Sequence, residues 1–171
     1  FLILFGTVGY FLLEFNNPET MGNLSVPEKV MASAFQSVTT RTAGFASVSQ
    51  SGLTESSRLL GCILMFIGGS PAGTAGGIKT TTAAMLFLTV LCVLKGQKDT
   101  ECFGRRVDMD TVLSGITITL ITFTCWLAAV AAMSVFDSQA EFLNLMYEAS
   151  SAIGTVGLSA DLTPHLSRAS H

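Results

Sequence analysis

Two short stretches rich in threonine and glycine contain the residue types that could bind a metal cation. One reads Gly-Thr-Val-Gly-Leu-Ser over residues 154–159, and the other reads Arg-Thr-Ala-Gly-Phe-Ala over residues 41–46. In an extended loop of this kind the backbone carbonyls can face one way, and rings of such carbonyls can replace the hydration shell of potassium. We therefore interpret both stretches as filter loops of a cation pore. The predicted ligands, mainly through backbone carbonyls, are Thr42, Ala43, Gly44, Phe45, Thr155, Val156, Gly157 and Leu158.

The two loops belong to an internal repeat that includes the helix expected before each of them. Aligning the loops also aligns Ser25 with Ser138 and Glu28 with Glu141. A serine followed three residues later by a glutamate is the pattern of a capping box, which starts a helix. We expect pore helices over 26–38 and 139–152, and filter segments over 39–46 and 153–159.

The predicted pore helices are too short to cross a membrane. At about 1.5 Å per residue the helix over 26–38 is about 20 Å long, whereas a bilayer core is about 30 Å thick. A half-helix that ends inside the bilayer directs the negative end of its dipole toward a dehydrated cation. The irregular backbone that follows must line a cavity or be buried in protein.

The composition is that of a membrane protein. Of the 171 residues 49% are hydrophobic and 12% are charged, compared with about 25% charged in an ordinary soluble domain. The net charge of −3, with no basic block, excludes a nucleic-acid partner. We expect a multi-pass protein of the cell membrane. The four cysteines form no metal-binding or disulfide pattern and are interpreted as packing residues.

Three apolar segments are expected to form membrane helices. Residues 1–13 are interpreted as part of a truncated transmembrane helix, with a buried core helix as the alternative, and 58–94 as a helix broken in its middle. Residues 112–136 carry no charge and are predicted to cross the bilayer. The hydroxyl residues in this last helix are expected to serve packing and to bond their own helix backbone rather than to line a polar pathway. Trp126 is also expected to be a packing residue.

A glycine-rich stretch interrupts the second apolar segment. Glycine and proline at this density predict a hinge or mobile insert, which we interpret as a gate. Lys79 follows it and should face water or a carboxylate. The predicted gate residues are Gly68, Gly69, Ser70, Pro71, Ala72, Gly73, Thr74, Ala75, Gly76, Gly77 and Lys79.

The same stretch permits a different interpretation, as a phosphate-binding loop over 73–80. Ile78 stands where that motif requires its second glycine, so nucleotide binding is disfavoured. A membrane-embedded phosphotransferase is therefore the lower-ranked alternative, and we expect a protein that is not an enzyme.

The distribution of basic residues predicts an orientation. Lys95, Lys98, Arg105 and Arg106 lie in the one extended charged connection, residues 95–110. Because Lys and Arg are enriched in cytoplasmic loops, this connection is expected to be cytoplasmic and the filter loops to enter from outside. Acidic residues on the outer side could raise the local cation concentration, although a solvated surface explains most of them.

Three stretches, residues 39–45, 68–79 and 151–159, resemble the Trk/Ktr/HKT superfamily of potassium transporters, most of all the Ktr membrane subunit. The resemblance implies an all-α integral membrane protein with potassium-channel-like repeats of helix, re-entrant pore loop and helix, four in one subunit. It implies that residues 1–94 form most of the third repeat, 95–111 a cytoplasmic linker, and 112–171 a fourth repeat whose second helix is missing. The chain is therefore expected to be a fragment that does not conduct alone.

The resemblance also implies ion, partners and function. It implies potassium uptake through a filter of four loops, including Gly44 and Gly157, with the gate in 68–77. The alternative is a sodium-permeable or sodium-coupled transporter of the same fold. The transported ion is K+, with Na+ as the alternative, and no organic cofactor is expected in this chain. The implied partners are the remaining repeats, a second subunit in a homodimer, a cytosolic nucleotide-binding regulatory ring and the lipid membrane.

Overall fold

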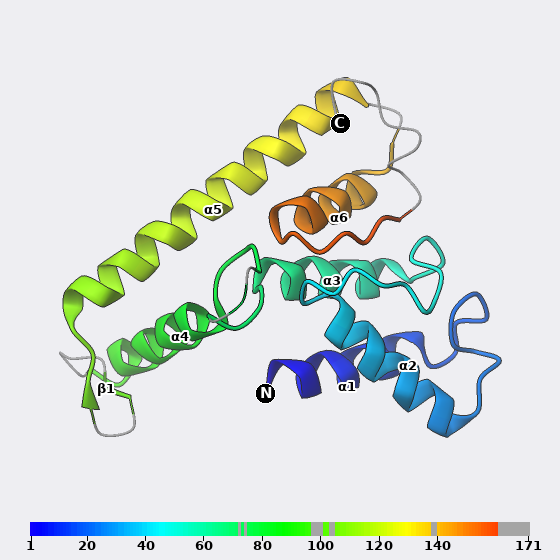
Figure 1. Ribbon diagram of the computed structural model, residues 1–171, viewed down its shortest axis with the longest axis horizontal. Helices are drawn as coiled ribbons and strands as arrows, with labels where there is room; N and C mark the ends of the chain where they lie inside the picture. Colours follow the sequence, from blue (N-terminus) through cyan, green and yellow to red (C-terminus); the bar gives the residue numbers. More distant parts are fainter. Residues whose placement is uncertain (72, 74, 97–100, 103–104, 138–139, 161–171) are drawn as a thin grey trace.

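Six α-helices make up most of the chain in the computed structural model (Figure 1). The structure describes residues 1–71, 73, 75–96, 101–102, 105–137 and 140–160. In chain order the helices are α1 (Leu2–Glu14), α2 (Val26–Thr39), α3 (Glu55–Phe66), α4 (Thr80–Leu94), α5 (Met109–Phe136) and α6 (Phe142–Ile153). A short antiparallel ladder of β1 (Glu101–Cys102) and β2 (Arg105–Arg106) lies in the connection between α4 and α5. The predicted helical architecture is confirmed, apart from this ladder.

One helix of the described chain, α5, is long and apolar enough to cross a membrane. Its 28 residues pack along α4 at one end and along α6 at the other (Figure 1). The shorter helices α1 and α4 are also apolar, and large side chains on all three are exposed, such as Leu4, Phe87 and Leu120. Extended exposed apolar surfaces of this kind indicate contact with lipid or with further protein.

The threonine hydroxyls of α5 bond their own helix, as expected. Thr117 donates to the Leu113 carbonyl at 2.8 Å, and Thr119 donates to the Gly115 carbonyl at 2.8 Å. The same pattern recurs at Thr122 and Thr124. These bonds satisfy the hydroxyls within the helix, so the predicted bonding to the helix backbone is confirmed, whereas the predicted role in helix packing stays a prediction.

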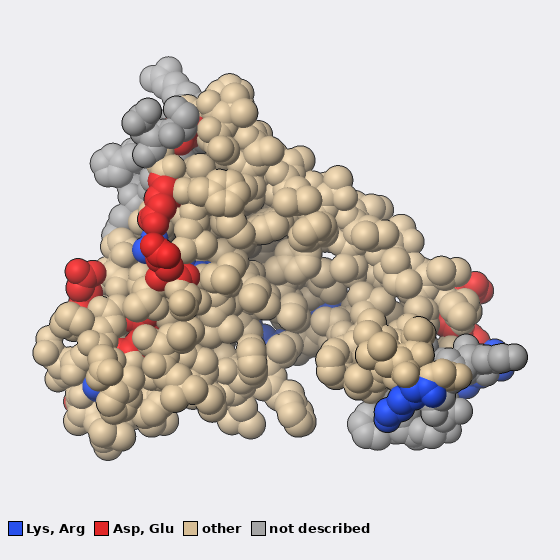
Figure 2. Space-filling model, turned by 180° about the vertical axis from the view of Figure 1, so that it is seen from behind, with Lys and Arg blue, Asp and Glu red and all other residues tan. Residues whose placement is uncertain are grey.

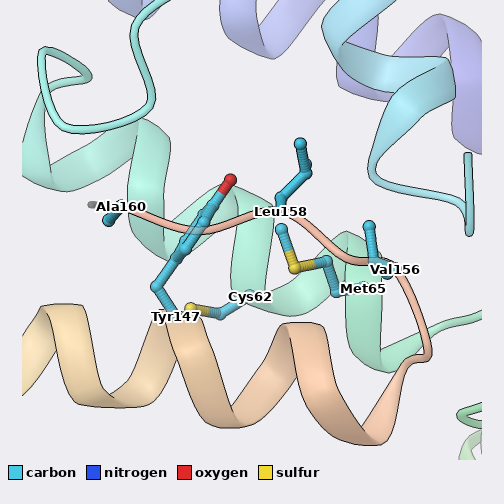
Figure 3. Packing of buried hydrophobic residues seen from close by; sticks show 6 residues of the cluster. All are labelled: Cys62, Met65, Tyr147, Val156, Leu158 and Ala160. Atoms are coloured by element: carbon cyan, nitrogen blue, oxygen red, sulfur yellow. The ribbon is translucent and has the colours of Figure 1, made fainter. Parts of the chain in front are cut away.

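Helix α6 lies between α5 and α3 and shares a core with the segment that follows it (Figures 1 and 3). Trp126 of α5 donates its indole N–H to the Ser150 hydroxyl of α6 at 2.9 Å and stacks on Phe123. The predicted packing role of Trp126 is confirmed, with a hydrogen bond added to it. The buried apolar cluster consists of Cys62 and Met65 from α3, Tyr147 from α6, and Val156, Leu158 and Ala160 from the following segment.

The capping box is present at the first pore helix and absent from the second. At α2 the Glu28 carboxylate accepts the backbone N–H of Ser25 at 2.8 Å and its hydroxyl at 2.7 Å, as predicted. The prediction that Glu141 is the glutamate of a capping box within the second helix is wrong. Helix α6 begins at Phe142, so Glu141 lies before the helix as its N-cap residue. The Glu141 carboxylate instead pairs with Arg58 of α3 at 3.0 Å. Ser138, the other half of the prediction, lies outside the described residues.

Charged side chains lie toward both ends of the molecule. Figure 2 shows basic side chains at the end that carries the connection between α4 and α5 and others toward the middle and the opposite end, and acidic side chains at both ends. Arg106 of β2 is among the exposed basic residues. The positive-inside rule counts the lysine and arginine residues of a connection, and this one carries Lys95, Lys98, Arg105 and Arg106.

Candidate ion site

Both predicted filter loops have the same unusual backbone. Thr42 and Gly44 have positive φ angles of 73° and 73°, and Thr155 and Gly157 have φ angles of 52° and 88°. Within the described ranges no other residue besides glycine has a positive φ. A β-branched residue in this region is a true outlier that costs about 1–3 kcal/mol. Strain of this size at two matched positions points to a functional requirement.

The pattern of handedness explains how such loops could present their carbonyls. In each loop two left-handed residues are separated by one that is not left-handed, Ala43 in the first loop and Val156 in the second. A left-handed residue turns the peptide planes on its two sides and so helps to set the direction of the loop carbonyls. A row of carbonyls that face one way is the arrangement that binds dehydrated cations.

The two loops lie against each other. A Cβ atom placed on Gly44 would sit 2.1 Å from the Val156 carbonyl oxygen and 3.6 Å from the Gly157 Cα. Only glycine permits this approach and the positive φ together. A Cβ atom on Gly157 would meet nothing within 4 Å, so that glycine faces open space in the described structure.

Each loop is fixed to its pore helix by a different residue. In the first loop the buried Thr39 hydroxyl accepts the Phe45 N–H at 2.8 Å and donates to the Phe45 carbonyl at 2.6 Å. In the second loop the Glu148 carboxylate accepts the Ser159 hydroxyl at 2.6 Å and the Ala160 N–H at 3.1 Å. Glu148 thus holds the end of the second loop, through the Ser159 side chain and the backbone of the residue that follows the predicted filter segment. Thr39 was not predicted, because nothing in the sequence distinguishes it from Thr40.

Side chains of the second loop alternate between the core and the open side. Val156 and Leu158 are 5% and 3% exposed and pack into the cluster on α3 and α6 (Figure 3). Thr155, which precedes them, and Gly157, which lies between them, are exposed. The apolar side chains therefore anchor the loop from behind and leave its other face free.

A buried polar network links the two pore helices behind the loops. Gln36 of α2 donates to the Gln50 side-chain oxygen at 2.7 Å, and Tyr147 of α6 donates to the same oxygen at 2.8 Å. Gln50 also donates to the Val48 carbonyl at 2.8 Å and to the Gln36 oxygen at 3.2 Å. No sequence motif marks these residues, so the network was not predicted.

The glycine-rich segment closes into a loop between α3 and α4. Ile78 donates to the Phe66 carbonyl at 3.0 Å, and Thr80 donates to the Gly69 carbonyl at 3.3 Å, so its two ends are joined. The Lys79 ammonium donates to the carbonyls of Gly73 at 3.1 Å and Ala75 at 2.6 Å. Lys79 therefore bonds the segment's own backbone, and its half-exposed side chain leaves the expected contact with water as a prediction. Ala72 and Thr74 lie outside the described residues.

This segment also borders the filter loops. Gly76 donates its N–H to the Thr155 hydroxyl at 2.8 Å. A cavity of about 410 Å³ lies beside the first loop and is lined by Ile3, Val38, Arg41, Thr42, Ala43, Gly69, Ser70, Gly73 and Ala75. The predicted gate and the predicted ligands thus lie next to each other.

The alternative of a phosphate-binding loop lacks its structural context. That motif joins a strand to a helix, whereas α3 precedes this segment. The ammonium that should bind phosphate is engaged with backbone carbonyls. Among the residues that the structure describes, no group of three or more His, Cys, Asp or Glu could hold a metal ion.

Comparison with known proteins identifies the family. The profile described as "TrkH: Cation transport protein" matches residues 3–171. The Ktr system potassium uptake protein B of Bacillus subtilis (strain 168) is 38% identical over 159 residues, which cover 93% of this chain and 36% of that protein. The protein of the same name from Vibrio alginolyticus is 38% identical over 166 residues, 97% of this chain and 36% of that protein.

A third relative is named for two ions. The potassium/sodium uptake protein NtpJ of Enterococcus hirae is 34% identical over 168 residues, 96% of this chain and 37% of that protein. The chain thus spans little more than a third of the length of these relatives. Because the family profile covers nearly every residue, including both strained loops and the glycine-rich segment, the chain belongs to the TrkH family of cation transport proteins, within the Trk/Ktr superfamily of membrane subunits.

Proposed function

We propose that this chain is part of a potassium uptake protein and contributes two loops of its selectivity filter. The observation that carries the proposal is the shared backbone of the loops, with left-handed Thr42 and Gly44 matched by Thr155 and Gly157. Their direct contact supports a common ion path, because one potassium ion is coordinated by several loops at once.

The proposed ligands are the backbone carbonyls of residues 42–45 and 155–158, with the hydroxyls of Thr42 and Thr155 at the inner end. The carbonyl of Phe45 already accepts the Thr39 hydroxyl, so it is the weakest of the eight. Among the described residues, no hydrogen bond is donated to the other seven carbonyls. Backbone ligands also explain why glycine, rather than any side chain, is the residue that the site depends on.

Residues 68–77 with Lys79 are proposed as the gate. Two observations support this proposal: Gly76 bonds the Thr155 hydroxyl, and Lys79 bonds the carbonyls of the same segment. An ion leaving the filter would have to pass this loop. Moving it requires breaking few hydrogen bonds, which suits an element that opens and closes.

The remaining parts of the proposal concern the whole protein. We propose that the chain holds most of the third repeat and the start of the fourth repeat of a four-repeat, multi-pass plasma-membrane subunit. The filter loops would face outside and 95–110 the cytoplasm, in keeping with the lysine and arginine residues of that connection. A homodimer and a cytosolic nucleotide-binding ring are the proposed partners, and the word "system" in the names of two relatives supports a further subunit.

Sodium is the second candidate ion. Sodium is favoured by the name of one relative, the potassium/sodium uptake protein NtpJ. The filter loops themselves favour potassium, since carbonyl rings replace its hydration shell more readily than that of the smaller ion.

The test uses the full-length protein that contains this chain. Gly44→Ser and Gly157→Ser each add a side chain at a left-handed glycine, and each should lower the preference for potassium over sodium in an uptake assay. Ser47→Ala, at an exposed position just beyond the first filter segment, is the control and should keep the preference. Unchanged selectivity in both glycine variants would reject the proposal.

A further inference from the structure

The Thr155 hydroxyl joins the glycine-rich segment to the second filter loop. Its oxygen accepts the Gly76 N–H at 2.8 Å. The backbones are as close as they can be: a Cβ atom on Gly76 would lie 2.6 Å from the Ile153 carbonyl oxygen and 2.8 Å from the Thr155 Cγ2. Only glycine permits this approach, so the hydrogen bond depends on two residues of fixed type.

The matched threonine of the first loop makes no such bond. A Cβ atom added to Gly69 would lie 3.8 Å from the Thr42 Oγ1, and Thr42 lines one cavity together with Gly69, Ser70 and other residues of the segment. Among the described residues, no hydrogen bond joins Thr42 to residues 68–77. The two filter loops are alike in backbone but differ in their connection to the segment.

The segment is otherwise tied mainly to itself and to the helices beside it. Lys79 bonds the carbonyls of Gly73 and Ala75, and Ile78 bonds the end of α3. Gly77, next to Gly76, has a φ of 69°, a backbone conformation that residues other than glycine rarely adopt. Losing the Thr155 bond would therefore release the segment from the filter while leaving its internal bonds intact.

Resting on the function proposed above, we propose that Thr155 is a positioning residue that latches the glycine-rich segment to the filter, and that potassium at the innermost filter site competes with Gly76 for its hydroxyl oxygen. A hydroxyl oxygen has two lone pairs, but a cation and the positive end of an N–H dipole repel each other when both approach it. Potassium at this site weakens the latch, and the latch weakens potassium binding by the same factor, since coupling between two sites is reciprocal.

The size of the effect follows from the bond that is shared. The net contribution of one neutral hydrogen bond corresponds to a change of about 2- to 10-fold in an equilibrium. The released fraction of the segment should therefore rise by about 2- to 10-fold when the hydroxyl is removed. It should rise similarly when potassium saturates the inner site of the unaltered protein.

The experiment measures the reactivity of a cysteine in the segment of the full-length protein. Ser70→Cys, at an exposed position of the segment, is introduced into a background without native cysteines, and its rate of modification by a water-soluble thiol reagent is compared in potassium and in choline. Thr155→Val keeps the β-branched shape and removes the hydroxyl. It should raise the rate in choline by about 2- to 10-fold and abolish the potassium dependence.

Two further variants separate the latch from general damage to the filter. Thr155→Ser retains the hydroxyl and should restore both the slow rate and its potassium dependence. Thr42→Val removes the matched hydroxyl, which makes no hydrogen bond to the described residues of the segment, so it should raise the rate in choline less than Thr155→Val does. Equal rates for Thr155→Val and the unaltered protein in choline, or equal acceleration by Thr42→Val, would overturn the latch.

Rubidium binding to the same purified proteins distinguishes failure of the latch from failure of the proposed function. If rubidium binds with potassium-sensitive affinity but Ser70→Cys reacts alike in all variants, the filter assignment stands and the latch is rejected. If the unaltered protein binds no rubidium, the proposed function is rejected, and the competition between ion and latch falls with it.

Discussion

Replacing Tyr147 and Gln50 separately and together tests whether the buried network behind the filter loops acts as one unit. Tyr147→Phe removes a single hydroxyl and its 2.8 Å bond, while the Gln50 oxygen keeps its bond from Gln36. No buried acceptor is left without a partner. The expected loss of stability is that of one net hydrogen bond, about 0.5–1.5 kcal/mol.

Gln50→Leu has a different consequence. It removes the partner of both Gln36 and Tyr147, each of which is fully buried. A buried polar group without a partner costs about 1–3 kcal/mol, so the two together predict a loss of about 2–6 kcal/mol. The effect of Tyr147→Phe on stability should then reverse its sign. In the Gln50→Leu background this substitution removes a buried hydroxyl that has lost its partner, so it should stabilise the protein.

The assay is the thermal unfolding midpoint of the purified full-length protein in detergent at fixed potassium concentration, for the unaltered protein, both single variants and the double variant. Residues in one network are expected to be non-additive, and the cycle measures that directly. Additive shifts, or a loss in Tyr147→Phe as large as that in Gln50→Leu, would refute the reasoning.

Three further predictions concern the loops themselves. Gly44→Ala should lower the unfolding midpoint and potassium uptake more than Gly157→Ala. Both variants place alanine at a positive φ, which costs about 1–2 kcal/mol, but only the alanine at position 44 meets a backbone oxygen, at 2.1 Å. Equal effects of the two variants would contradict this. Thr39→Val should reduce potassium affinity in a rubidium-displacement assay while Thr39→Ser retains it, since the hydroxyl holds Phe45 from both sides. Glu148→Ala should cost more potassium affinity than Glu148→Gln, whose amide oxygen still accepts the Ala160 N–H; indistinguishable variants would show that this bond does not position the loop.

The features that the sequence predicted correctly are those fixed by local rules. The span of α5 follows from an uncharged apolar run, and the start of α2 follows from Ser25 and Glu28, which are neighbours on one turn. The break between α3 and α4 follows from its density of glycine. In each case the residues that decide the structure are close together in the chain, so no knowledge of the fold is needed.

The features that were missed depend on partners far away in the chain. Glu141 has the right spacing for a capping box, but a cation on another helix, Arg58, engages its carboxylate instead. The carbonyls that Lys79 bonds were not predicted, because they come from a loop folded back on itself. Gln50 has no distinctive neighbours in sequence and gains its role only because Tyr147 is brought to it by the packing of α6 on α3.

The repeat is therefore stricter in backbone than in side-chain support. Each loop contains one strained threonine, and strain of about 1–3 kcal/mol persists only where surrounding contacts fix the conformation. Thr39 fixes the first loop by holding both polar groups of Phe45, and Glu148 fixes the second through Ser159 and Ala160 at its end. Because an ion senses only the positions of oxygen atoms, the two loops can present matching carbonyls while their side-chain contacts differ. The Thr39 hydroxyl also donates to the Phe45 carbonyl, whereas the matching carbonyl of the second loop, that of Leu158, accepts no such bond among the described residues. The two loops therefore need not contribute equally to an ion that lies between them.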